Sequence, residues 1–387
     1  MRGRLASLRR LFAPGQELVL TGMRLHPWCG LLGECGMAIP PAYWPRAARL
    51  TVQSGLNEVI ARMEERHFES QIAAQRPRPP LFILGCWRSG TTWLHHLLAR
   101  DPSLAAPTGL QVLHPHTFFF LEGRLPGFAP RLARYPYRIW ADLNWGRQAG
   151  RPSKRVSDNV MVGLQEPAED EFALLMMKSS DLLSHLLGPK LARRYGRFLN
   201  LRELDANSRR AWQEQWVWFL KKLTLRHGPR TLVLKSPNHT ARVRTLLELF
   251  PQARFVHLHR HPFEVYRSLT RHLGLLESVS DVLQQRQPNH HETCLELYET
   301  IYSAYLDDRP FIPPGQLVEL SFEQLEADPQ LALKTIYTQL GVEGQPAPVA
   351  AAASYEKNRY PALDSATRQL LYRRWGRYFE AFGYELP

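Results

Sequence analysis

The sequence predicts an α/β fold in which a P-loop-like parallel sheet is flanked by helices, with helical additions at the N-terminus and in mid-chain. Three strand-like runs support this prediction, and each leads through a short polar loop into residues with helical spacing. Strands that alternate with helices in this way form parallel sheets with right-handed crossovers. The three runs are Leu81–Leu84, Thr231–Leu234 and Arg254–His259.

The first run is continuously apolar, as expected of a strand that is buried on both faces. It ends at Gly85, and the residues up to Gly90 form a short turn rich in small side chains. The order of strand, small-residue loop and helix therefore begins the predicted fold. The helix is predicted to start near Thr91, because apolar residues then recur at Trp93, Leu94, Leu97 and Leu98.

This loop predicts an anion-binding site. A loop rich in Gly, Ser and Thr exposes backbone N–H groups at the positive end of a helix, and Arg88 adds a fixed charge. The spacing from Gly85 to Gly90 matches a nucleotide-triphosphate P-loop, but Thr91 stands where that loop has Lys. A turn that binds no ligand is the alternative interpretation. The candidate ligand residues are Arg88, Ser89, Gly90, Thr91 and Thr92.

Three cations follow the carboxyl ends of the predicted strands, where ligands bind in open α/β sheets. They are Arg88, Lys235 and Arg260. We therefore expect them to converge on one rim of the sheet. Ser268, eight residues after Arg260, lies on the helix that follows, and these two residues form a second candidate anion site. Near the C-terminus, a basic loop is predicted to close over an anion through Lys357 and Arg359.

The remaining elements divide the chain into two parts. Residues 1–75 are predicted to be a mostly helical N-terminal extension, whose last helix packs through Leu56, Ile60, Met63 and Phe68. Residues 76–387 form the α/β domain, with a mostly helical insertion at 118–230. The domain closes with a strand at Gln316–Leu320, helices at Phe322–Leu325 and Gln330–Leu340, and a C-terminal packing helix at 362–383.

Composition limits the partners and the compartment. Lys and Arg total 49 against 36 Asp and Glu, a net charge of +13, which favours anionic partners. The four cysteines form no pair with zinc spacing, so we expect no metal and a cytoplasmic location. No apolar run is long enough to span a membrane. The basic start, with Arg2, Arg4, Arg9 and Arg10, suggests either peripheral membrane contact or a solvated terminus.

The motifs together resemble the sulfotransferase family that uses 3′-phosphoadenosine 5′-phosphosulfate (PAPS). The segment WRSGTTWL (Trp87–Leu94) is similar to the family's 5′-phosphosulfate loop, and RHPFEVYRS (Arg260–Ser268) is similar to its 3′-phosphate Arg and Ser. Further resemblance lies in LKSP (Leu234–Pro237) and LVELSFEQLEADP (Leu317–Pro329). The resemblance covers about residues 80–340 and looks closer to the tyrosylprotein-type or carbohydrate-type branch, in a bacterial form, than to the cytosolic branch.

The resemblance implies in-line transfer of a sulfuryl group from PAPS to a hydroxyl, phenol or amine, leaving 3′,5′-adenosine bisphosphate. It adds Trp93 to the residues that bind the donor and gives Lys235 the role of catalytic Lys, with Arg88 stabilising charge. A sulfuryl donor has no γ-phosphate bridged by magnesium, which explains the missing P-loop Lys. The expected acceptor is a small molecule, a glycan, a lipid or a peptide side chain, and no nucleic acid is expected.

The general base is the least defined part of this prediction. Pro237 stands where cytosolic members have His, and Gln111 stands where the other branch has Glu. His239, one helical turn past Lys235, is the first candidate because its ordinary pKa suits a base. The further candidates are His114, His116 and Glu166. Glu166 belongs to an acidic patch, Glu166–Glu171, whose charges also fit the N-terminus of a helix.

Two other functions remain open from the sequence. The P-loop-like spacing also fits a kinase or NTPase. Gln111 and Pro237, at positions where a base is expected, also fit a non-catalytic basic protein that binds a nucleotide, a nucleic acid or a membrane. The sequence identifies neither the acceptor nor the oligomeric state.

Overall fold

A five-stranded parallel sheet lies at the centre of the molecule. The computed structural model describes residues 20–36, 39–124, 153–154, 161–186, 189–280, 289–349, 358 and 360–385. The strand order is β2-β5-β1-β6-β7, and every neighbouring pair is parallel. The strands are β1 (Leu81–Leu84), β2 (Leu104–Ala105), β5 (Thr231–Lys235), β6 (Arg254–His259) and β7 (Leu317–Ser321).

The predicted parallel α/β fold is confirmed. β1 and β6 have the predicted bounds, β5 extends one residue further to Lys235, and β7 lies one residue later than expected. The central strand β1 is buried along its whole length. Leu81 and Ile83 face one apolar cluster, and Phe82 and Leu84 face another, so helices cover both sides of the sheet.

The parallel register brings the functional loops to one edge. Ile83 pairs with Lys235, and Leu84 pairs with His257, so β5, β1 and β6 end close together. The loop after β1 leads into α4 (Thr91–Leu98), which packs against β1 and β5. Beyond β5 lie the 3₁₀ helix η3 (Pro237–Ala241) and α12 (Val243–Leu249), and β6 leads into α13 (Pro262–Ser280).

The described residues of the mid-chain insertion are mostly helical. Its longest helix, α11, packs Trp212, Trp216 and Phe219 in the main core, and a short antiparallel pair, β3 and β4, forms the second sheet. α5 (Gly109–Leu113) precedes the insertion, whose elements are α6 (Phe118–Leu121), β3 (Ser153–Lys154), β4 (Met161–Val162), α8 (Glu171–Met176), α9 (Leu182–Leu186), α10 (Pro189–Gly196) and α11 (Ala206–His227).

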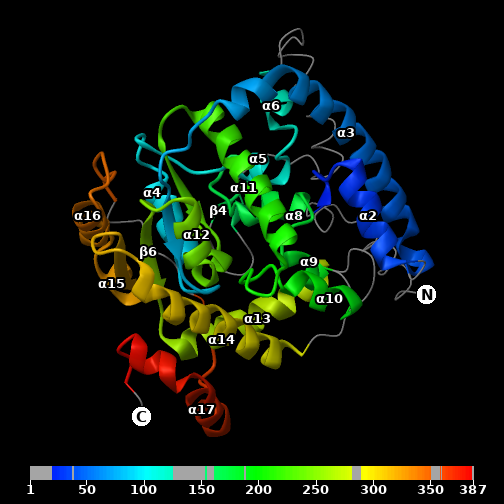
Figure 1. Cartoon of the computed structure of the whole chain (residues 1–387). Coiled ribbons are helices and arrows are strands. Elements are labelled where there is room, and N and C mark those ends of the chain that lie inside the picture. The colour runs from blue at the N-terminus through cyan, green and yellow to red at the C-terminus, as the bar shows by residue number, and fades with distance from the viewer. Residues whose placement is uncertain are drawn as a thin grey trace.

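The N-terminal part consists of α2 (Leu25–Cys35), the 3₁₀ helix η2 (Pro41–Tyr43) and the long α3 (Trp44–Ala73). Figure 1 shows α3 along the outer edge of the molecule, on the side opposite to the C-terminal helix. The described residues of this part are mostly helical, and the predicted packing of Leu56 is wrong, because 56% of this residue is exposed. Phe68 lies in the main core with Ile60 and Met63 packed against that core, as predicted, and α3 also buries Leu50 and Ala61.

The C-terminal third covers the β6–β7 side of the sheet and one end of the core. α14 and α17 pack against α13, and Trp375 of α17 stacks on Tyr298 of α14 at a centroid distance of 3.9 Å. Within the described ranges, no helix is both long and apolar enough to cross a bilayer. These elements are α14 (His290–Asp308), η4 (Arg309–Phe311), α15 (Phe322–Ala327), α16 (Pro329–Leu340) and α17 (Ser365–Ala381).

Candidate active site

The loop between β1 and α4 has a backbone that only small residues at key positions allow. Gly85 and Gly90 have φ angles of 144° and 93°, in the region that favours glycine. A Cβ atom on Gly90 would lie 2.3 Å from the ring of Phe322, so the loop also packs too closely for a side chain. The turn therefore presents the first N–H groups of α4, which have no acceptor within the helix, at the sheet edge.

The structure gives Ser89 a supporting position. Its hydroxyl donates to the carbonyl of Cys86 at 2.8 Å, and its backbone N–H donates to the same oxygen at 3.3 Å. Ser89 is fully buried. Its polar groups therefore hold the shape of the loop, while Thr91, Thr92 and Trp93 follow at the start of α4.

Arg88, Arg260 and Ser268 come together as predicted from the sheet topology. Arg88 Nε donates to Ser268 Oγ at 2.8 Å, and Arg260 Nη1 donates to the carbonyl of Arg88 at 3.3 Å. The Arg260 guanidinium also lies 4.6 Å from the centre of the Phe322 ring. The two candidate anion sites of the sequence are thus parts of one basic cluster.

Tyr360 belongs to the same cluster, although the sequence did not indicate it. Its hydroxyl is 3.0 Å from Ser268 Oγ and accepts a hydrogen bond from Asn358 Nδ2 at 3.3 Å. Burial raises the pKa of Tyr360, but the hydrogen bonds from Ser268 and Asn358 and the charge of Arg88 outweigh it, so the pKa is lowered. Lys357 and Arg359, predicted for this loop, lie outside the described residues.

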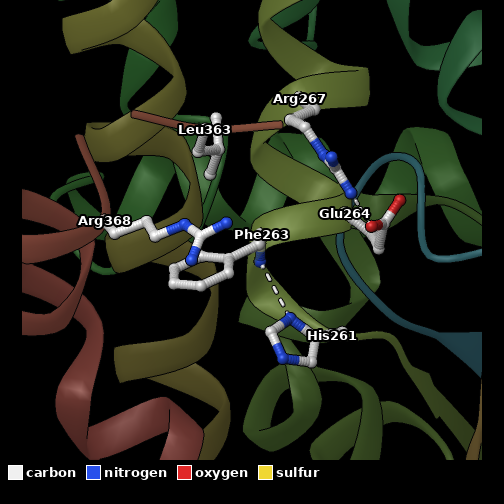
Figure 2. A pocket seen from close by; sticks show the side chains of 6 residues that line it. All are labelled: His261, Phe263, Glu264, Arg267, Leu363 and Arg368. Carbon is white, nitrogen blue, oxygen red and sulfur yellow. Dashed lines mark hydrogen bonds and ion pairs between the residues drawn. The ribbon is translucent and has the colours of Figure 1, made fainter. Parts of the chain in front are cut away.

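A cavity of about 310 Å³ adjoins this cluster between α13 and α17. Figure 2 shows Arg267 and Glu264 of α13 on one side and Arg368 of α17 on another, with Leu363 at its wall. Arg267 Nη1 donates to the carbonyl of Pro361 at 3.0 Å. This hydrogen bond holds the segment that carries Tyr360 against α13, the helix that also carries Ser268.

Lys235 lies at the end of β5 and is 98% buried, with 2% exposed. Its Nζ donates to Thr92 Oγ1 at 3.4 Å and forms an ion pair with Glu169. The Glu169 side chain is 17% exposed. Lys235 thus bridges the loop between β1 and α4 and a partly exposed carboxylate.

The acidic patch pairs residue by residue with the chain after β5. Glu169 contacts Lys235, Asp170 accepts from His239 at 2.9 Å, and Glu171 pairs with Arg242 at 2.6 Å. The sequence explanation through the helix macrodipole is therefore incomplete, because α8 starts only at Glu171. The three pairs hold the start of α8, and the residues just before it, against the end of β5 and the η3 segment.

His239 occupies a position that does not favour a general base. It is fully buried, its ring lies 5.3 Å from the ring of Phe82 and 5.7 Å from that of Trp216, and its Nε2 is bound to Asp170. The Asp170 carboxylate also accepts from Trp216 Nε1 at 2.8 Å. An acceptor hydroxyl at the sheet edge has no access to this imidazole, so its geometry indicates a supporting role.

The other candidate bases differ in access. His114 is buried, and burial lowers its pKa to about 3. His116 stacks on Trp218 at 4.9 Å, and burial lowers its pKa well below the ordinary value. Glu166 is better placed, with Oε2 3.6 Å from Nδ1 of His96 on α4. Because burial disfavours the protonated form of both histidines, they are poor proton acceptors.

Known proteins similar to this chain are sulfotransferases. Residues 79–346 match the family model described as "Sulfotransferase family". The chain belongs to the sulfotransferase family. Across 99% of its length it is 27% identical to the proteins named "Omega-hydroxy-beta-dihydromenaquinone-9 sulfotransferase Stf3" of Mycobacterium bovis and Mycobacterium tuberculosis, of which it covers 94%.

Two solved sulfotransferase structures share the fold. Sulfotransferase STF9 from Mycobacterium avium has 19% sequence identity and a TM-score of 0.64, over 97% of this chain and 96% of that one. Sulfotransferase STF1 from Mycobacterium tuberculosis H37Rv has 16% identity and a TM-score of 0.58, over 99% of this chain and 98% of that one. Because its family match spans residues 79–346, the protein is a sulfotransferase enzyme, and the kinase or NTPase alternative is set aside.

Within this sulfotransferase, Gln111 has a structural explanation. It forms a capping box with Thr108 at the start of α5, and its Nε2 donates to Glu122 at 3.0 Å. A Gln at this position therefore serves the helix and gives no reason to expect lost catalysis. Among the described residues, no group of His, Cys, Asp and Glu side chains is arranged to hold a metal ion.

Proposed function

We propose that this sulfotransferase transfers the sulfuryl group of PAPS to a hydroxyl of a hydrophobic, lipid-like acceptor in the cytoplasm. The observation that carries the proposal is the position of Lys235, which contacts both Thr92 of the anion-binding turn and Glu169. A cation and a carboxylate at the end of a phosphate-binding helix are the two groups that this transfer needs.

The residues present fit a donor with two anionic ends. We assign the 5′-phosphosulfate to the N–H groups at the start of α4, to the Thr91 hydroxyl and to the Thr92 hydroxyl, which also contacts Lys235. Trp93, next on α4, offers an aromatic face for the nucleoside. The 3′-phosphate would be held by Arg260, Ser268 and Tyr360, with Lys357 and Arg359 of the same C-terminal segment.

The chain's own groups account for the proton and the charge. As the bond from the acceptor oxygen to sulfur forms and the bond from sulfur to the phosphate oxygen breaks, the Glu169 carboxylate accepts the hydroxyl proton. The Lys235 ammonium, close by, stabilises the charge that develops on the leaving phosphate oxygen. Arg88 adds positive charge on the other side of the turn, where it already binds Ser268.

The acceptor class rests on the curated relatives. Their printed name gives a hydroxylated dihydromenaquinone, a lipid alcohol, and the similarity covers nearly the whole of both chains. We extend that class, but not the individual compound, to this enzyme. The basic N-terminus, with Arg2, Arg4, Arg9 and Arg10, is proposed to add peripheral contact with an anionic membrane.

Two assays test this function. In a thermal shift assay, 3′,5′-adenosine bisphosphate should stabilise the protein without magnesium, since a ligand that binds only the native state raises its melting temperature. Stabilisation only by ATP with magnesium would contradict the donor assignment. Transfer of labelled sulfate from PAPS should be highest to long-chain alcohols and hydroxylated quinones in a panel that includes phenols and amines. Lys235→Ala should abolish transfer.

A further inference from the structure

The long helix α3 buries several polar side chains and exposes several apolar ones. Its inward face carries four polar side chains that are each at most 5% exposed: Arg46, Ser54, Asn57 and Glu64. Asn57 Nδ2, for example, donates to the carbonyls of Thr21 and Met23. The inner surface of α3 is thus anchored by polar contacts as well as by apolar packing.

Its outward face is apolar. Between Trp44 and Val59, all six exposed residues are apolar, and they recur at helical spacing along about 24 Å of the helix. The large members are 60%, 68%, 56% and 60% exposed, in chain order. A continuous row of exposed apolar side chains along one helix is the pattern of a helix that lies at a lipid interface. The six residues, named here the α3 stripe, are Trp44, Pro45, Ala48, Val52, Leu56 and Val59.

The α3 stripe can be buried in an apolar environment without leaving the indole N–H of Trp44 unpaired. The polar atom of Trp44, its indole Nε1, donates to the carbonyl of Ile39 at 3.0 Å, so burying the ring leaves no unsatisfied donor. Charged side chains of both signs follow the stripe, because Glu69 is exposed beside Arg66 and Arg62 forms an ion pair with Glu58. Arg62 and Arg66 are exposed, and Arg62 lies five full turns beyond Trp44 on the same side of α3.

Charge and area favour a lipid surface over a second protein. The segment before Leu20 carries Arg2, Arg4, Arg9 and Arg10, and the chain as a whole has a net charge of +13, which complements anionic lipid. A stripe about 24 Å long and one helix face wide, about 10 Å, offers roughly 250 Å². That is well below the about 800 Å² per partner of a stable protein interface.

We propose that the α3 stripe docks on the surface of an anionic bilayer, with α3 parallel to the membrane plane and Arg62 and Arg66 at the headgroups. Interfacial helices bind in this way, through apolar side chains at the acyl boundary and cations that meet anionic lipid. Figure 1 shows that α3 lies at the outer edge of the molecule, where a flat surface can reach it. The stripe extends the proposed function, because it brings the enzyme to a membrane-dissolved acceptor.

Co-sedimentation of the full chain with phosphatidylcholine vesicles, with and without phosphatidylglycerol, tests the proposal. The wild-type protein should bind the anionic vesicles, and high salt should weaken that binding. Val52→Glu with Leu56→Glu should weaken it about tenfold or more, since both the apolar contact and the charge match are lost. The matched control is Leu331→Glu on α16, where the replaced side chain is 59% exposed, and it should bind as the wild type does.

Two results would overturn the proposal. In the first, the wild-type protein does not bind the vesicles and is a dimer by light scattering, while the double variant is a monomer. The stripe would then be an interface between copies of the chain. The other is an equal loss of vesicle binding in Leu331→Glu. Transfer from PAPS to a water-soluble alcohol, measured without vesicles, should be unchanged in the double variant. A failure of docking is therefore distinguishable from a failure of the proposed function.

Discussion

At the scale of single residues, the site depends on which carboxylate faces Lys235. Glu169 and Glu166 lie in one acidic patch, three residues apart, but only Glu169 forms the ion pair with Lys235. Glu166 is instead near His96 on α4. The identity of the proton acceptor follows from this difference in position.

We therefore predict that Glu169→Gln lowers kcat for sulfate transfer by about 10²–10⁴, the usual contribution of a general base. Gln keeps the size of the side chain and an acceptor oxygen for Lys235, so the fold should be retained. Steady-state assays with labelled PAPS measure the effect. Glu166→Gln is the matched control, and a larger loss in this control than in Glu169→Gln would transfer the role to Glu166.

Tyr360 gives a second prediction at this scale. Its hydroxyl joins Ser268 and lies in the basic cluster of Arg88. Because a hydrogen bond to a charged group is worth about 1.5–3 kcal/mol, Tyr360→Phe should raise the Kd of 3′,5′-adenosine bisphosphate about 10-fold to 100-fold. Calorimetry should show no change for 5′-AMP, which lacks the 3′-phosphate. Tyr372→Phe, a tyrosine of α17 that packs on Phe263, is the control and should change neither constant.

At the scale of elements, α3 is fastened to the insertion by a buried ion pair. Lys222 of α11 donates to Glu64 of α3 at 2.6 Å and to the carbonyl of Pro115 at 2.8 Å. Glu64 also accepts from the backbone N–H of Phe120. Both charged side chains are buried, and burial raises the pKa of Glu64 and lowers that of Lys222. The pair therefore links the N-terminal helices to the main core.

Lys222→Met should reduce the free energy of unfolding by about 3–5 kcal/mol, because it leaves a buried carboxylate without its cation. Urea denaturation measures the loss. Lys222→Met with Glu64→Leu should recover much of it, since the double variant leaves no buried charge. Lys221→Met, one residue away on the exposed side, serves as control. If the double variant were as unstable as Lys222→Met, the loss of stability would not come from the unpaired Glu64 carboxylate.

The positions of helices and strands could be predicted from the sequence better than the contacts between side chains distant in the chain. Continuous apolar runs such as β1 and β6 identify buried strands directly, and the parallel order then brings Arg88, Lys235 and Arg260 to one edge. Nothing in the local sequence reveals that His239 is enclosed by Trp216 and Asp170, because that enclosure involves a segment about seventy residues away. The exposure of Leu56 was missed for a different reason, because both faces of α3 carry apolar and polar residues and the spacing does not identify the buried face.

At the scale of the whole molecule, buried histidines couple stability to pH. Burial lowers the pKa values of His95 and His114 to about 3 from the ordinary 6.5. Between these values the unfolded chain binds protons that the native protein does not bind. The stabilising effect is thus complete above pH 6.5 and is lost progressively as the pH falls toward 3.

His114→Leu should reduce the slope of unfolding free energy against pH by up to about 1.4 kcal/mol per pH unit in this window. Urea denaturation at several pH values from neutral to acidic measures the slope. His67→Leu, at an exposed position of α3, should leave it unchanged. An unchanged slope in His114→Leu would show that His114 is protonated in the native protein.

We propose that one clamp holds a donor with two anionic ends and places its reactive end between Lys235 and Glu169. A crystal structure with 3′,5′-adenosine bisphosphate bound tests this most directly. We expect the 3′-phosphate within hydrogen-bonding distance, about 3.2 Å or less, of Arg260, Ser268 and Tyr360, and the 5′-phosphate at the start of α4 beside Lys235. A bisphosphate bound in the opposite direction, or away from Lys235, would contradict it.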